Sequence, residues 1–121
     1  METAKINIIG KTVTVAYCYA TEIAFKKMSA EDINDFTEEI TQAIKDNRMP
    51  DVEKSIMLIM SAMLAYCQAT GTEQTIQDSE IMTECSPKEL SMALAAILGL
   101  RIDFYKVDEN DEEKKGEPAK N

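Results

Sequence analysis

The chain holds few of the side chains that enzymes use for catalysis. Its 121 residues include no histidine, the commonest side chain for acid–base catalysis and for binding metals. Cys18, Cys67 and Cys85 lie far apart without a Cys-x-x-Cys pair, and no motif places a base beside them. The four glycines are scattered, so no glycine-rich phosphate loop is present. We therefore expect no catalytic residues, no cofactor and no metal site, and interpret the chain as a non-enzyme.

Acidic residues are plentiful, but their positions favour a structural role. Pairs such as Glu31/Asp32 and Glu38/Glu39 fall at expected helix starts or on polar helix faces, where carboxylates act as caps or are solvated. The 13 Lys and Arg against 22 Asp and Glu give a net charge of −9, which disfavours binding to nucleic acid. The scattered cysteines and an N-terminus without an apolar signal sequence predict a cytoplasmic location. The longest apolar stretch is too short to span a membrane.

Methionines recur on the most apolar segment, residues 55–67, where Met57, Met60 and Met63 are three residues apart. Methionine adapts to irregular surfaces and is common in binding grooves, but it also fills gaps in cores. A helix that is apolar almost all round is either central or pressed against a second molecule. We expect part of this helix to meet a client or another copy of the chain. The candidate binding residues are Ile56, Met57, Met60, Met63 and Leu64.

The elements that must position these residues begin with a β-hairpin. Residues 5–9 and 12–16 flank Gly10-Lys11, and glycine at the first central position suits a type II′ turn. The resulting pairing puts four branched apolar residues on one face: Ile6, Ile8, Val13 and Val15. Since a two-stranded ribbon is barely stable alone, helices or another subunit must cover this face.

Helical periodicity follows the hairpin. A short helix is expected over 19–28, and Ser29 is expected to cap a second one that ends before Pro50. The predicted buried stripes of these two helices are Ala20, Ile23, Ala24 and Met28, with Phe25 nearby, then Ile33, Phe36, Ile40 and Ile44. The apolar helix is expected to run from residue 50 or 51 to Thr70, with Gly71 as its stop.

The second half of the chain ends in a strongly marked helix. A short helical turn is expected over 78–84, and Ser86-Pro87-Lys88-Glu89 forms a capping box that starts a helix reaching about Val107. Its predicted buried stripe is Leu90, Ala93, Leu94, Ile97 and Leu98. Residues 108–121 contain six acids and three lysines without a large apolar residue, which predicts a flexible acidic tail.

Together these patterns predict an α+β fold that is mainly α: a short N-terminal hairpin followed by about four to five helices in a compact bundle. Residues 1–107 are expected to form a single domain, and residues 108–121 the tail.

The order of the elements carries a resemblance. The hairpin around Gly10-Lys11 is followed by a helix that starts with aromatic and small residues (17–25) and by a break (28–29). An apolar helix (52–67), a short segment (76–84) and a last helix (87–105) come after it. Over residues 5–106 this order resembles the tail assembly chaperones of long-tailed bacteriophages. The resemblance concerns the pattern of elements rather than a sequence motif. One departure is Met28-Ser29-Ala30, where that family often has a glycine.

The resemblance implies a non-enzymatic role in the cytoplasm of a bacterial host. Such proteins bind the long hydrophobic tape measure protein, prevent its aggregation and help to recruit tail tube subunits; many members also have a longer, frameshifted product. A second interpretation is a small structural or regulatory interaction module whose methionine-rich helix is its own core or a self-association seam. Both interpretations predict protein partners and a homo-oligomer. An enzyme using carboxylates or a cysteine is disfavoured, since the usual catalytic set is missing.

Overall fold

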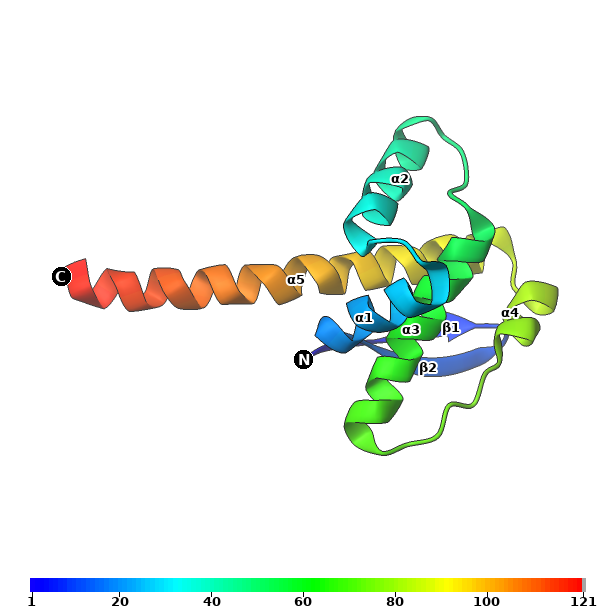
Figure 1. Ribbon diagram of the computed structural model, residues 1–121, viewed down its shortest axis with the longest axis horizontal. Coiled ribbons are helices and arrows are strands. Elements are labelled where there is room, and N and C mark those ends of the chain that lie inside the picture. Colours follow the sequence, from blue (N-terminus) through cyan, green and yellow to red (C-terminus); the bar gives the residue numbers. More distant parts are fainter. Residues whose placement is uncertain (121) are drawn as a thin grey trace.

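The computed structural model describes the backbone of residues 1–120 and the side chains of residues 1–106. Its elements are, in order, β1 (Glu2–Ile8), β2 (Lys11–Tyr17), α1 (Tyr19–Ser29), α2 (Ile33–Lys45), α3 (Val52–Thr70), α4 (Asp78–Glu84) and α5 (Pro87–Lys120). In this part of the chain an antiparallel hairpin is therefore followed by five helices (Figure 1). The predicted fold class, α+β and mainly α, is confirmed.

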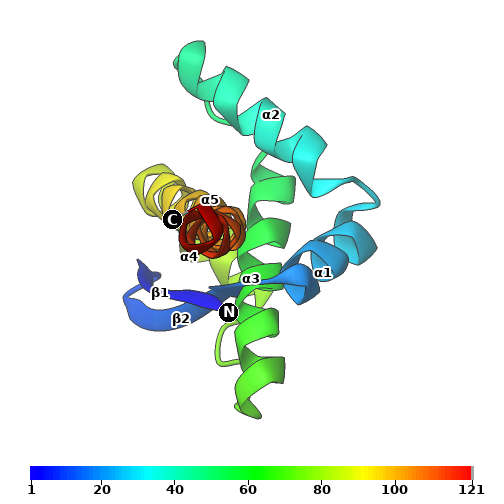
Figure 2. The same ribbon diagram turned by 90° about the vertical axis from the view of Figure 1, so that its left-hand side faces the viewer.

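Helix α3 is the centre of the body. The hairpin and α5 lie on one side of it and α1 on the other, with α2 across its N-terminal end (Figure 2). Leu58, Ile59 and Ala62 of α3 are completely buried. The helix begins after its N-cap Asp51 and ends at Gly71, which takes the left-handed conformation (φ 71°). The predicted limits of the apolar helix are confirmed, and of the two alternatives expected for it, central or pressed against a second molecule, the structure shows a central position in its own chain.

The hairpin differs from the predicted one in its register. Ile8 pairs with Lys11 and Ile6 with Val13, so the two-residue loop is Ile9-Gly10 instead of Gly10-Lys11. Both loop residues have positive φ (47° and 74°), which makes a type I′ turn in place of the expected II′ turn. Because the register is shifted by two residues and side chains alternate with period two, the same apolar residues still share one face.

The junction of α1 and α2 also differs from the prediction. Ser29 is the last residue of α1 and not the cap of α2, because its hydroxyl donates to the Phe25 carbonyl at 2.7 Å, one turn back. The same hydroxyl accepts the Glu31 N–H at 3.1 Å. Ala30 then ends α1 in the left-handed conformation (φ 60°), and Asp32 caps α2 by accepting a backbone N–H at 2.8 Å.

The predicted buried stripes of α1 and α2 are correct only in part. Three residues expected in the core are exposed: Ile23, Met28 and Ile44. On α1 the core side is formed by Phe25, which was expected near the stripe, and by Thr21, which was not. The Thr21 hydroxyl donates to the buried Ala16 carbonyl of β2 at 2.8 Å and turns that side inward. On α2, Ala43 is buried in place of Ile44.

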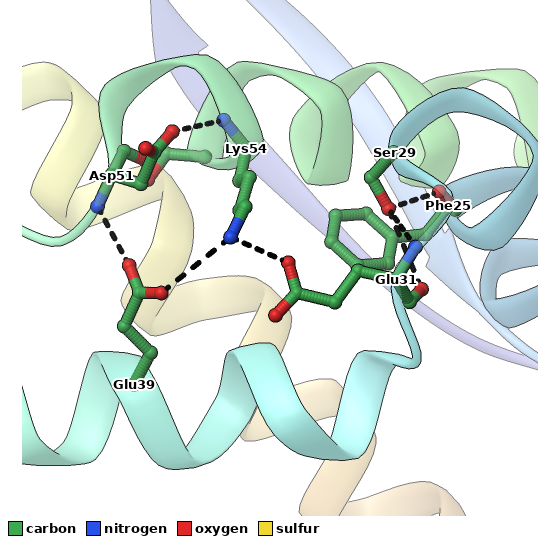
Figure 3. A network of polar contacts seen from close by, with 7 residues as sticks. Phe25, Ser29, Glu31, Glu39, Asp51 and Lys54 are labelled. Carbon is green, nitrogen blue, oxygen red and sulfur yellow. Dashed lines mark hydrogen bonds and ion pairs between the residues drawn. The ribbon is translucent and has the colours of Figure 1, made fainter.

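Polar contacts attach α2 to α3, as Figure 3 shows. Lys54 Nζ lies 2.7 Å from Glu31 Oε2 and 3.8 Å from Glu39 Oε1. Glu39 also accepts the Asp51 N–H at 3.0 Å, next to the start of α3. The hydrogen bond to Glu31 raises the pKa of Lys54, so this amine stays charged. These contacts hold α2 across the N-terminal end of the central helix.

The C-terminal helix begins where the capping box predicts. Ser86 Oγ accepts the Glu89 N–H at 3.2 Å, and Glu89 Oε1 accepts the Ser86 N–H at 3.1 Å. The predicted stripe is confirmed, with Leu98 half-buried and the others buried. The helix extends to Lys120 and does not end near Val107. Side chains from residue 107 on lie outside the described residues, so the single domain over 1–107 and the flexible tail over 108–121 stay predictions.

Candidate functional site

An apolar groove of about 470 Å³ opens between α1, α3 and α4. Helix α3 contributes Met57 and Met60, which lie almost one turn apart, while Met28 comes from the end of α1 and Met82 from α4. Four methionines from three elements therefore meet at one surface, which we call the methionine groove. Its lining residues are Met28, Glu53, Ile56, Met57, Met60, Asp78 and Met82.

Polar side chains hold two of these methionines in place. The Ser61 hydroxyl donates to the Met57 carbonyl at 2.7 Å and also lies 3.6 Å from the Met28 sulfur. The Gln74 side-chain amide lies 3.7 Å from the Met60 sulfur. Because Ser61 is fully buried, its contact fixes the end of α1 against α3. The groove is thus a consequence of how α1 and the segment before α4 pack on the central helix.

The groove combines exposed apolar side chains with an acidic rim. Met28 is 40% exposed and Met82 57% exposed, whereas Met57 and Met60 are half-buried. Glu53 and Asp78 lie at its edge, in the first turns of α3 and α4. Neither carboxylate has an ion-pair partner among residues 1–106. The site is therefore apolar inside and negatively charged at its margin.

A second, smaller cavity of about 140 Å³ extends this surface towards the start of α5. It shares Ile56 and Met82 with the methionine groove and adds Met49 and Val52, which are 39% and 53% exposed. The two cavities form one apolar surface along the side of α3. Such a continuous surface suits an elongated ligand better than a small molecule.

The structure separates the five candidate residues into two groups. Met57 and Met60 line the methionine groove, as expected for a binding surface. Ile56 (5% exposed) also borders it but belongs mainly to the core, and Met63 (3% exposed) is a core residue. Leu64 is half-buried and does not line the groove.

Sequence reasoning missed two lining residues, Met28 and Met82, because they reach the groove from other elements. Only their residue type could have indicated a role in the groove, since each is a methionine on a short helix next to a connecting segment. The helical spacing that identified Met57 and Met60 cannot reveal partners on separate elements.

The side chains with perturbed titration do not form a catalytic set. Partial burial, with a smaller effect of Glu89, raises the pKa of Cys85, so this thiol is not an activated nucleophile. Glu22 Oε2 accepts the hydroxyls of Tyr17 and Tyr105, each at 2.6 Å. Burial and then this hydrogen bond raise the pKa of Tyr17, and the hydrogen bond raises the pKa of Tyr105 to about 12. These bonds join β2, α1 and α5 and serve to hold the fold together.

Two further observations concern the described part of the chain. Residues 1–106 contain no group of three or more Cys, Asp or Glu placed to hold a metal ion. Within the same described residues, no helix combines the length and the apolar character needed to cross a bilayer.

The chain was also compared with known proteins. No family model matches it, and the curated proteins and solved structures gave no match either.

Proposed function

We propose that this protein is a non-enzymatic assembly chaperone that binds an apolar face of a client helix in the methionine groove. The observation that carries the proposal is the convergence of four methionines from α1, α3 and α4 on one partly exposed surface. Methionine side chains are flexible and polarizable, so a groove made of them accepts helices of differing sequence. An amphipathic helix laid into such a groove buries its apolar residues while its polar side stays in water.

The charge of the chain favours a particular kind of client. Glu53 and Asp78 border the groove, and the whole chain carries a net charge of −9. A client helix with Lys or Arg beside its apolar face would gain from this rim. The negative charge also keeps copies of the chaperone apart while the groove is empty.

The tail assembly chaperones of long-tailed bacteriophages are the family that this proposal favours. The client would then be the tape measure protein, and the partners would include tail tube subunits in the cytoplasm of a bacterial host. Support comes from the order of elements: hairpin, short helix, central apolar helix, short α4 and a long last helix.

A second candidate function is self-association, in which an exposed face of α1 of one copy meets the methionine groove of another. Ile23 is 56% exposed on α1, and the exposed Lys26 and Lys27 follow it. In a symmetric dimer these lysines could meet the acidic rim of the partner's groove. Measuring the molar mass in solution with and without client separates the candidates: formation of a chaperone–client complex, with dissociation of any dimer, favours the chaperone, and a dimer that excludes the client favours self-association.

The test introduces a charge into the groove. Met60→Asp is expected to make a co-expressed client, a long helical protein such as a tape measure protein, insoluble, because the introduced carboxylate would be buried without a partner in the complex. Met82→Asp is the second variant, since this exposed residue can change without unfolding the chain. Leu64→Asp, outside the groove, is the matched control. Client solubility that survives both groove variants, with folding verified by circular dichroism, would refute the proposal.

A further inference from the structure

The outer edge of β1 lacks a strand partner. The sheet formed within residues 1–120 has two strands, so each strand pairs on one side only. In an antiparallel hairpin closed by a two-residue loop, the residues flanking the loop exchange both hydrogen bonds, and so does every second pair after them. Here those pairs begin with Ile8 and Lys11 and continue with Ile6 and Val13. The backbone groups of Thr3, Lys5 and Asn7 therefore point outward, away from β2.

One backbone group on this edge shows what the edge can bind. The N–H of Ile9, next in the same outward series, donates to Glu89 Oε2 at 2.8 Å. The outward N–H groups of Thr3, Lys5 and Asn7 have no backbone or side-chain acceptor among residues 1–106. The edge is thus satisfied at its turn end and unsatisfied along the rest of its length.

A groove of about 320 Å³ runs along this unsatisfied edge, between β1 and the first turns of α5. Its apolar lining includes Met92, which is 63% exposed, and the small side chains of Ala93 and Ala96. Small residues on the helix leave space for another backbone to approach β1. The groove is separate from the methionine groove, and the full lining is Lys5, Ile6, Asn7, Lys88, Glu89, Met92, Ala93 and Ala96.

The rim of the groove is positively charged although the chain as a whole is acidic. Lys5 and Lys88 are exposed, and neither forms an ion pair within residues 1–106. The remaining charged residue, Glu89, keeps its negative charge while it accepts the Ile9 and Ser86 amides, so two lysines against one carboxylate leave the lining with a net charge of +1. An acidic ligand is therefore favoured here. A second copy of β1 fits less well, because it would bring its own Lys5 to this edge and like charges would repel.

We propose that β1 captures an extended segment of a partner protein by strand addition, with apolar side chains over Ala93 and Ala96 and alternate acidic side chains beside Lys5 and Lys88. Backbone hydrogen bonds to the outward groups of β1 provide most of the binding, and the side chains provide the specificity. The proposal concerns a surface other than the methionine groove. It does not depend on the proposed chaperone function.

The experiment measures binding of a peptide that carries fluorescein on its N-terminus, fluorescein-Thr-Val-Glu-Val-Glu-Val-Thr-amide, to the full chain at low salt. We expect saturable binding that weakens about tenfold in the double variant Lys5→Glu/Lys88→Glu, since two attractive contacts become repulsive. The control is Lys26→Glu/Lys27→Glu, which changes the net charge equally but lies on α1, on the other side of α3 (Figure 2). This control should bind within about twofold of the wild type.

Two peptide analogues test the backbone contacts. Each carries N-methyl groups on one alternate set of amides, so only one analogue loses the N–H groups that face β1, and only that analogue should lose binding. Amide chemical shifts should change at Thr3, Lys5 and Asn7 and not at Thr14 on the opposite edge. The proposal is overturned if the peptide does not bind, if both analogues bind equally, if the lysine variants have no effect, or if a dimer of the chain occupies the edge.

Discussion

Replacing Thr21 by valine tests the buried hydroxyl that joins the hairpin to α1. Thr21 is completely buried, and its hydroxyl donates to the Ala16 carbonyl at 2.8 Å and accepts the Cys18 N–H at 3.2 Å. Valine has nearly the same shape but cannot form either bond. Leaving a buried polar group without a partner costs about 1–3 kcal/mol. Ala16 is fully buried and Cys18 only half-buried, so water can replace the second bond better than the first.

We therefore expect Thr21→Val to lower the free energy of unfolding by about 2–3 kcal/mol. Thr21→Ser is the matched control because it keeps the hydroxyl and loses one methyl group, for a cost of about 1 kcal/mol. In thermal unfolding followed by circular dichroism, the valine variant should melt about 10 °C below the wild type, at about 4 °C per kcal/mol. A valine variant as stable as the serine variant, or more stable, would refute this account of the junction.

Three further predictions concern charged and titrating groups. Hydrogen bonds from the Ser86 amide and, to a smaller extent, the Ile9 amide lower the pKa of Glu89. Their contribution to the stability of the fold is therefore complete above the ordinary pKa of 4.5 and is lost as the pH falls below it. Urea midpoints of the wild type and Glu89→Gln should accordingly differ at pH 7 and converge towards pH 3. Lys54→Met removes the ion pairs that attach α2, through Glu39, and the connection before it, through Glu31, to α3. Hydrogen exchange should therefore speed up in α2 but not in α3; equal protection of α2 in the variant and the wild type would contradict this. The hydrogen bond to Glu22 raises the pKa of Tyr105 to about 12. The difference in the free energy of unfolding between the wild type and Tyr105→Phe should therefore be constant below the ordinary pKa of 10.0 and vanish as the pH rises through 12. Chemical unfolding at each pH measures this difference.

Signals confined to a few neighbouring residues predicted the fold well. The start of α5 at Ser86-Pro87 and the stop of α3 at Gly71 depend on capping geometry, which each sequence segment determines by itself. The central position of α3 followed from the scarcity of polar residues on any side of it. These features need no knowledge of the rest of the chain.

The turn of the hairpin could not be predicted in this way. Isoleucine is rarely found at positive φ, so Ile9 was an improbable turn residue on local grounds. Its N–H is bound by Glu89, 80 residues further along the chain, and this long-range contact supports the conformation. The predicted turn used Gly10 correctly but assigned it the wrong position in the loop.

The candidate site was predicted in part for a similar reason. Met57 and Met60 were identified because helical spacing shows which residues of one helix share a face. Met63, three residues further on, lies outside the groove and is covered by the core. The contributions of Met28 and Met82 depend on the tertiary packing of α1 and α4 on the central helix, which no local pattern contains.

The bond between Ile9 and Glu89 also bears on the order in which this protein is made. During translation the hairpin leaves the ribosome before the carboxylate that supports its turn and before α5, which packs on β1. Until α5 has been made, the strand residues that α5 covers stay open to water or to cellular folding factors. Final assembly of the body has to await synthesis of α5, so translation pauses between the hairpin and α5 should leave the product vulnerable to proteolysis.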